Sequence, residues 1–227
     1  MTAPLRLVIF DVDGTLVDSQ GHIVASMTAA FQALGAAVPT REAILGIVGL
    51  SLDVAVPRLA PTLSGAQHGA LVQGYKDSYR RLRLAHGAAE ASPLYPGALG
   101  ALQRLAANDD ILLGVATGKS KRGLDALIDA HGLERMFVTR QCADFHPSKP
   151  HPSMIYAALS EAGVDAANAV MVGDTSFDMD MAQAAGVTGI GVTWGYHAPA
   201  ALTAATHIVQ DFDALHSTIT THWSLPV

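Results

Sequence analysis

The chain has 227 residues, half of them apolar and only 15% charged, with a mean hydropathy of +0.29. This composition provides for a buried core and excludes intrinsic disorder. Fourteen basic residues face twenty acidic ones, for a formal net charge of −6, and no basic run has the character of a nucleic-acid-binding surface. Against a prior of about 150 residues per domain, the length predicts one large domain, or a core that carries an insertion.

Cysteine usage and hydropathy predict where in the cell the protein lies. The one cysteine, Cys142, excludes an intramolecular disulfide, and the lack of paired Cys/His spacings argues against structural zinc. We interpret Cys142 as an inert buried thiol. No run approaches the ~18 apolar residues that span a bilayer, and Asp11 ends the first apolar run too early for a secretory signal. We therefore expect a cytoplasmic protein that binds neither membrane nor nucleic acid.

The first part of the chain contains one strand and then helices. Residues 5–10 (LRLVIF) form a nearly continuous apolar run, which predicts a strand buried on both faces of a parallel sheet. From Leu16 to Pro93 the apolar residues recur three or four apart, as at Ile23, Met27 and Phe31, and no strand is predicted. Residues 16–93 are therefore expected to form a helical insertion.

After Tyr95, strand and helix patterns alternate. Strands are predicted at 111–116, 136–138, 169–172, 188–192 and 207–209, with helical patterns between most of them. Parallel neighbours need crossover connections, and these usually carry helices. The sequence thus predicts an α/β fold with a doubly wound, parallel, Rossmann-like core. This core comprises residues 1–15 and 94–227, and the insertion comprises 16–93.

Polar residues follow several of the predicted strands. Ligands of such sheets bind outside the carboxyl ends of the strands, so these residues are expected to meet at one edge of the sheet. They are Asp11 and Asp13 after the first strand, Thr117 and Gly118 after the second, Lys149 in a loop after the third, and Asp174 and Asp178 after the fourth.

The acidic residues of this set predict a metal site. Carboxylates held close together repel one another, and a hard divalent cation such as Mg²⁺ relieves that repulsion. Asp174 and Asp178 are four apart, so in a helix they share one face, where like charges are unfavourable. A turn at Asp11 and Asp13, or helix capping by Asp174 and Asp178, explains single acids better than it explains the set.

The remaining members of the set predict a phosphate site. Thr117 and Gly118 lead into a helix N-terminus, whose free N–H groups and dipole favour phosphate. Lys149 adds a cation among three prolines, Pro147, Pro150 and Pro152, which suggests a fixed position. A solvated loop lysine is its ordinary alternative.

Four motifs in chain order resemble those of the haloacid dehalogenase superfamily. They are DVDGT (11–15), ATGKS (116–120), SKPHP (148–152) and GDTSFD (173–178). The resemblance covers essentially the whole chain. The helical insertion after the first motif is similar to the cap domain of the phosphoglycolate phosphatase-like branch, so residues 16–93 would be a cap.

The resemblance implies a role for each acid. Asp11 would be the nucleophile that attacks phosphorus to give an aspartyl-phosphate, and would also bind Mg²⁺. Asp13 would be the general acid and base, with its backbone carbonyl as a metal ligand. Asp174 would be the third protein ligand. Asp178 would hold a metal-bound water or orient Lys149.

The resemblance also implies the phosphate ligands and the reaction. Thr117, Gly118 and Lys149 would hold the transferring phosphoryl group. The chain would be a Mg²⁺-dependent phosphoric monoester hydrolase acting on a small phosphorylated metabolite, with 2-phosphoglycolate as the first candidate. The alternative is a β-phosphoglucomutase-like sugar-phosphate mutase, which shares the four motifs. The sequence leaves open whether the protein is a monomer or a homodimer.

Other branches fit less well. Dehalogenating members lack the second acid, so Asp13 favours phosphoryl chemistry. Phosphonate-cleaving members use a cap lysine, and we interpret the only lysine of the insertion, Lys76, as part of a solvated helix face. A non-catalytic protein that kept the fold would have lost an essential group, and none is missing.

The sequence offers three candidates for reading the leaving group. They are the turn 49–51, the helix that bears Arg41, and the segment 194–197. Each also has a purely structural explanation, as a glycine turn, a surface arginine, and an aromatic cluster packed on a loop.

Overall fold

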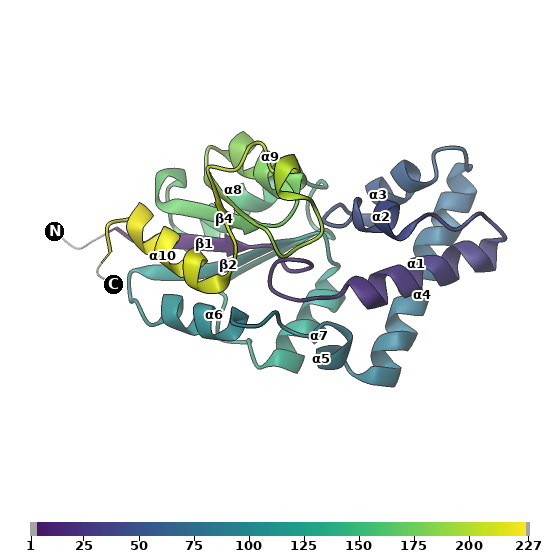
Figure 1. Cartoon of the computed structure of the whole chain (residues 1–227), viewed down its shortest axis with the longest axis horizontal. Coiled ribbons are helices and arrows are strands. Elements are labelled where there is room, and N and C mark those ends of the chain that lie inside the picture. The colour runs from purple at the N-terminus through teal and green to yellow at the C-terminus, as the bar shows by residue number, and fades with distance from the viewer. Residues whose placement is uncertain (1–3, 226–227) are drawn as a thin grey trace.

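The computed structural model describes residues 4–225 and contains a six-stranded parallel sheet with helices on both faces (Figure 1). The spatial order of the strands is β3-β2-β1-β4-β5-β6. The chain therefore winds outward from β1 in one direction, returns, and winds outward in the other, which places a topological switch point between β1 and β4. The predicted α/β, doubly wound class is confirmed. The strands are β1 (Arg6–Phe10), β2 (Ile111–Thr117), β3 (Thr139–Cys142), β4 (Ala169–Gly173), β5 (Thr188–Val192) and β6 (His207–Val209).

Helices cover both faces of the sheet, and each face has its own apolar cluster. Helices α6 (Ala98–Ala106), α7 (Lys121–His131) and α10 (Phe212–His222) cover one face. Helices α8 (Ser153–Ala162) and α9 (Ser176–Ala185) cover the other. Short 3₁₀ turns, η1 (Ala166–Asn168) and η2 (Pro199–Ala201), precede β4 and β6.

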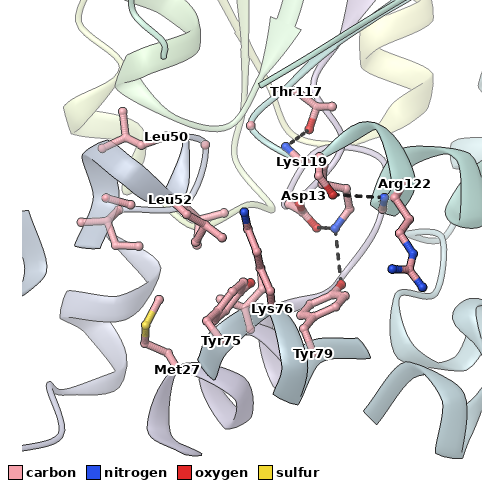
Figure 2. A pocket seen from close by; sticks show the side chains of 18 of the residues that line it. Asp13, Met27, Leu50, Leu52, Tyr75, Lys76, Tyr79, Thr117, Lys119 and Arg122 are labelled. Carbon is pink, nitrogen blue, oxygen red and sulfur yellow. Dashed lines mark hydrogen bonds and ion pairs between the residues drawn. The ribbon is translucent and has the colours of Figure 1, made fainter. Parts of the chain in front are cut away.

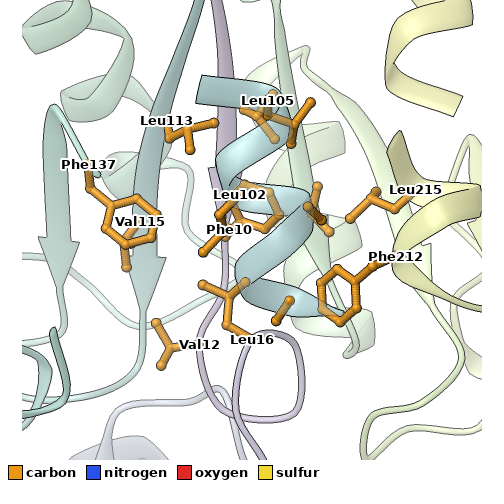
Figure 3. Close-up of a cluster of buried hydrophobic side chains, with 14 of the residues drawn as sticks. Phe10, Val12, Leu16, Leu102, Leu105, Leu113, Val115, Phe137, Phe212 and Leu215 are labelled. Carbon is orange, nitrogen blue, oxygen red and sulfur yellow. The ribbon is translucent and has the colours of Figure 1, made fainter. Parts of the chain in front are cut away.

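Strand β1 shows why the fully buried part of a central strand is apolar. Successive side chains of a strand point to opposite faces, and in β1 Val8 and Phe10 enter the cluster under α6 and α10, whereas Leu7 and Ile9 enter the cluster under α8 and α9. Figure 3 shows Phe10 packed against Leu102 on the first of these faces. Because both faces are buried from residue 7 to residue 10, no polar residue interrupts that part of the strand.

The segment between β1 and α6 forms a helical unit to one side of the sheet (Figure 1). Its helices enclose a third apolar cluster of their own. Within residues 16–93 the only strand-like pairings are the isolated bridges of Val17 to Asp13 and to Leu94. We propose that residues 16–93 form a cap on a core of residues 1–15 and 94–227. This is the division that the sequence predicts. The helices are α1 (Gln20–Leu34), α2 (Arg41–Leu45), α3 (Leu52–Leu59), α4 (Gly65–His86) and α5 (Ala88–Ala91).

Helix α4 is the longest helix, with 22 residues, and it packs along α1 in the cap. It carries many charged side chains along its length. Within residues 4–225, none of the helices combines the length and the apolar character that crossing a bilayer requires.

One strand was predicted at the wrong place. The sequence pattern put a strand at 136–138, but β3 begins at Thr139 and runs to Cys142. Phe137 is buried in the core cluster, whereas Val138 is exposed, so the apolar run there packs a loop. β3 is an edge strand with the polar sequence TRQC, which carries little of the pattern that identifies a buried strand.

The packing of α6 on the sheet gives a stability prediction. Leu102 is fully buried, whereas Leu99 on the same helix is 40% exposed. Leu102→Ala is expected to lower the free energy of unfolding by about 2 to 5 kcal/mol through lost burial and a residual cavity. Leu99→Ala is the matched control and should cost below about 1 kcal/mol. Urea denaturation of both variants measures this, and equal losses would contradict the core assignment.

Candidate active site

Four loops bring the predicted site residues to one edge of the sheet. Asp11 and Asp13 follow β1, Thr117 is the last residue of β2, and Asp174 follows β4. Because the sheet is parallel, the carboxyl ends of these strands share one edge, at the switch point of the topology. Lys149 reaches the same place from the loop after β3. All five side chains are buried, and Asp13 is the most accessible of them at 8%.

Lys149 forms the centre of the buried charges. Its Nζ donates to Asp11 Oδ1 at 2.7 Å and to Asp178 Oδ1 at 2.6 Å, and its side chain has no exposure. Although burial lowers it, the pKa of Lys149 lies above its ordinary value because these two carboxylates stabilise the ammonium. Asp178 Oδ2 accepts from the Thr175 N–H at 3.0 Å and from its hydroxyl at 2.7 Å. Asp178 therefore both caps α9 and orients Lys149.

Asp174 is held by donors on both oxygens. Its Oδ1 accepts from the Thr15 hydroxyl at 2.8 Å, and its Oδ2 accepts from the Tyr196 backbone N–H at 2.8 Å. Gly14 has a φ of +87°, and a Cβ there would collide with the Asp174 carboxylate, so the DGT turn requires glycine. The segment 194–197 thus contacts the site directly, through Tyr196.

The carboxylates form a donor set that fits a metal ion. Asp11, Asp174 and Asp178 each offer an oxygen, and these oxygens lie within 4.8 Å of one another. Asp11 Oδ2 is buried and has no hydrogen-bond partner in residues 4–225. Burial raises the pKa of Asp11 to about 7, and burial together with the Asp178 and Asp11 charges raises the pKa of Asp174 well above its usual value. Asp11 and Asp178 share the Lys149 ammonium and Asp174 adds a third buried carboxylate, so a divalent cation with a preference for oxygen would balance the site.

Asp13 belongs to a different network from the other acids. Its Oδ1 accepts from the Ser19 hydroxyl and from Lys119 Nζ, the latter at 2.7 Å. The Ser19 backbone N–H donates to the Tyr196 hydroxyl at 3.0 Å. Lys119 Nζ also lies 3.3 Å from the Tyr79 hydroxyl and 5.2 Å from the centroid of that ring. Burial lowers the pKa of Lys119, but the Asp13 carboxylate outweighs this and raises it above the ordinary value.

Lys119 and Thr15 are not among the site residues that the sequence predicts. Lys119 lies inside the ATGKS motif, which was a signal that it was near the site. Thr15 lies inside DVDGT in the same way. Ser19 and Tyr79 have no such signal, because only the folded chain brings them together with Asp13 and Lys119. Tyr196 belongs to the segment 194–197, which the sequence offers as a candidate for reading the leaving group.

A cavity of about 480 Å³ lies between the cap and this edge of the sheet (Figure 2). Asp11 and Asp13 line it from the core, next to Thr117 and Gly118 and the first turn of α7. Lys149, Asp174 and Asp178 lie beneath this lining. The cap contributes an apolar wall from α1 and the segment 47–55, and a mostly polar wall from α4. The apolar wall consists of Ile23, Met27, Ile47, Val48, Leu50, Leu52 and Ala55.

The turn 49–51 of the cap touches the core at the loop that follows β2. A Cβ on Gly118 would lie 2.6 Å from the Gly49 carbonyl oxygen, so only glycine fits there. The Ser51 backbone N–H donates to the Ser148 hydroxyl at 2.9 Å. Gly49 and Leu50 line the cavity, whereas Arg41 is exposed, pairs with Gln20 and does not line it.

The interpretation of Lys76 as part of a solvated helix face is incomplete. The side chain is exposed, but it lines the cavity, and Figure 2 shows it extending from α4 between Leu52 and Asp13. Helical periodicity identified the face of α4 that Lys76 occupies, but it did not show that this face covers the site.

Comparison with known proteins identifies the family of this chain. Residues 8–192 match the family model of haloacid dehalogenase-like hydrolases. The chain belongs to this family. A probable phosphatase, IndB, from Dickeya dadantii is 39% identical over 202 residues, covering 88% of this chain and 86% of that protein. A phosphoglycolate phosphatase from Agrobacterium fabrum is 34% identical over 215 residues, covering 92% and 90%. The structure of a haloacid dehalogenase-like hydrolase from Streptococcus pneumoniae, 27% identical, superposes with a TM-score of 0.81 over 94% of this chain and 98% of that one.

The raised pKa of Asp11 predicts how the stability of this haloacid dehalogenase-like hydrolase depends on pH without metal. The folded chain keeps a proton on Asp11 up to about pH 7, whereas the unfolded chain releases it near 3.8. Raising the pH through this window therefore lowers the free energy of unfolding, because the folded state binds more protons.

Urea denaturation in a chelator, at about pH 5 and about pH 8, tests this dependence. The wild type should lose more stability between the two pH values than Asp11→Asn does. Asp18→Asn is a matched control, because Asp18 binds Gln20 and does not line the cavity. Parallel losses in wild type and Asp11→Asn would contradict the assignment.

Proposed function

We propose that this family member is a Mg²⁺-dependent phosphatase, which hydrolyses a small phosphomonoester through an aspartyl-phosphate on Asp11. The observation that carries the proposal is the shared lining of one cavity. Asp11 and Asp13 face it together with Thr117 and Gly118, beside the N-terminus of α7. A nucleophile, a proton donor and a phosphate cradle thus meet at one place. The similarity to a phosphoglycolate phosphatase supports the same reaction class.

In the first step, a carboxylate oxygen of Asp11 attacks phosphorus and the bond from phosphorus to the leaving oxygen breaks. Asp13 gives its proton to that oxygen, so the product leaves as an alcohol. The Thr117 hydroxyl and the Gly118 N–H hold the phosphoryl oxygens. Lys149 lies behind Asp11 and stabilises the negative charge around it.

In the second step, a water molecule attacks the phosphorus of the aspartyl-phosphate. Asp13, now a carboxylate, accepts the proton of this water, and the bond between phosphorus and Asp11 breaks. Inorganic phosphate leaves and both carboxyl groups return to their starting states. Splitting the reaction over a covalent intermediate replaces one difficult step by two easier ones.

Asp11, Asp174 and the backbone carbonyl of Asp13 are the groups proposed to hold the Mg²⁺ ion, with Asp178 behind them. When bound, the ion would supply positive charge for the phosphoryl oxygens and offset the clustered carboxylates. The unpartnered Oδ2 of Asp11 supports this assignment.

The charges around the cavity support a substrate with a second anionic group. Lys76, Arg80 and Arg83 follow the i, i+4, i+7 spacing that puts them on one face of α4, and all three line the cavity. In the described part of the chain none of them forms an ion pair within 4.0 Å. Asp77 and Asp144 also line the cavity, but a carboxylate beside Lys76 would still find a cation. 2-Phosphoglycolate is therefore the first substrate to try.

The function is tested by phosphate release with Mg²⁺ from 2-phosphoglycolate, β-glucose 1-phosphate and other small phosphomonoesters. Asp11→Asn is expected to lower kcat at least about 1,000-fold, because it removes the nucleophile. Asp18→Asn, the matched control, should stay near wild type. A variant Asp11→Asn that keeps most of its activity would contradict the mechanism. Conversion of glucose 1-phosphate to glucose 6-phosphate without phosphate release would favour the mutase instead.

Lys76 gives a separate prediction about substrate choice. Lys76→Met is expected to lower kcat/KM for 2-phosphoglycolate by about tenfold or more, the loss of one charge-assisted hydrogen bond. The value for 2-hydroxyethyl phosphate, which lacks the carboxylate, should change little. Arg81→Met is the control, since Arg81 lies on α4 but does not line the cavity. Equal losses for both esters would contradict a carboxylate-binding role.

A further inference from the structure

Lys119 has no assigned role in the reaction, yet it links Asp13 to the cap. Its Nζ donates to Asp13 Oδ1 at 2.7 Å and lies 3.3 Å from the hydroxyl of Tyr79 on α4 (Figure 2). We propose that Lys119 is a positioning residue that orients the carboxyl group of Asp13 and makes this orientation depend on contact with the cap. The inference rests on the proposed function, because it assumes that Asp13 is the proton donor.

The contacts of Asp13 distinguish its two oxygens. Ser19 and Lys119 both donate to Oδ1. No hydrogen bond reaches Oδ2 from residues 4–225, and the side chain lines the cavity. A carboxyl group whose Oδ1 accepts two donors carries its proton on the other oxygen. Oδ2 is therefore the atom that delivers the proton to the leaving oxygen, and the two donors fix its direction.

The backbone and the cap hold Lys119 in place. Its N–H donates to the Thr117 hydroxyl at 3.2 Å, and its carbonyl accepts from the Ala143 N–H at 3.0 Å. The ammonium lies 5.2 Å from the centroid of the Tyr79 ring, within the range of a cation–π interaction. Its side chain is only 10% exposed, so water competes weakly for these contacts. One anchor is in the core and the other is in the cap.

Ser19 alone would leave this link incomplete. Ser19 donates to Asp13 from the start of the cap, and Ser19 in turn is hydrogen-bonded to Tyr196 in the loop after β5. Among the described residues, Lys119 alone donates to Asp13 from the loop after β2 and also contacts α4. Lys119 therefore places the proton donor relative to both the phosphate cradle and the cap wall that contacts the leaving group.

A leaving-group comparison separates positioning from a purely structural ion pair. The quantity kcat/KM covers phosphoryl transfer to Asp11 and departure of the leaving group. Benzyl phosphate expels an alkoxide, which needs a proton, whereas p-nitrophenyl phosphate expels a stable phenolate, which does not. The two esters are similar in size, and neither leaving group carries a second anion. A misplaced Asp13 slows the first ester selectively, and a distorted site slows both.

The experiment measures kcat/KM for both esters, with Mg²⁺, in wild type, Lys119→Met and Asp13→Asn. Lys119→Met is expected to lower the benzyl phosphate value about tenfold or more beyond its effect on p-nitrophenyl phosphate, as part of the contribution of general acid catalysis. Asp13→Asn should show the same selectivity more strongly. Lys121→Met is the matched control, because Lys121 is exposed, pairs with Asp125 and does not line the cavity. It should leave both values near wild type.

Two further variants test the link to the cap. Lys119→Arg keeps the cation and should recover part of the benzyl phosphate activity. Tyr79→Phe removes the hydroxyl but keeps the ring, and should slow benzyl phosphate selectively in wild type but not in Lys119→Met, because interacting residues are non-additive. If Lys119→Met fails to fold, as shown by circular dichroism, the selectivity of Tyr79→Phe and Lys119→Arg decides the question.

The outcomes distinguish the positioning role of Lys119 from the proposed function. Equal losses on both esters in Lys119→Met, with Asp13→Asn selective, would overturn the positioning role and leave the proposed function intact. Loss of selectivity in Asp13→Asn as well would overturn the acid role of Asp13, and the inference with it. Additive effects of Lys119→Met and Tyr79→Phe would overturn the link to the cap.

Discussion

The arrangement of this molecule depends on the burial of several carboxylates around one ammonium. Asp11 and Asp178 share Lys149, and Asp174 lies close by without a cation of its own among the described residues. Burying charge in a low-dielectric interior is costly unless partners compensate. The compensating groups come from separate loops and from Thr175 at the start of α9. The site therefore exists only when the parallel sheet brings the carboxyl ends of its strands together.

The second constraint is that the site is completed by two parts of the chain. The core supplies the acids and the loop with Thr117 and Gly118, and the segments of the insertion supply the far walls of the cavity. Direct contacts join them, at Gly118 against Gly49 and at Lys119 against Tyr79. A close-packed contact without room for a Cβ leaves little tolerance for misalignment. The chemistry at Asp13 and the shape of the cavity are therefore set by the same interface.

The sequence predicted what depends on local pattern. Strand β1 was recognised because burial on both faces leaves a continuous apolar run, and Asp11 and Asp174 were found because they directly follow strands. Strand β3 was misplaced because an edge strand of polar residues lacks that pattern. Tyr79 was not assigned, since its contacts join residues far apart in the chain, and Tyr196 was included only as part of the candidate segment 194–197. Lys76 was judged by its helix alone, and a helix does not reveal what its exposed face covers.

The two connections between the core and the insertion run side by side. Val17 bridges to Leu94, the Asp18 N–H donates to the Pro93 carbonyl at 2.9 Å, and the Tyr95 N–H donates to the Leu16 carbonyl at 3.0 Å. These two connecting segments are joined by hydrogen bonds, so they move together as one unit, here called the strap. The insertion is therefore tethered at one edge, and any rotation relative to the sheet must bend that strap. Since Val17 also bridges to Asp13, the pivot of such a rotation and the proposed proton donor share one short stretch of backbone.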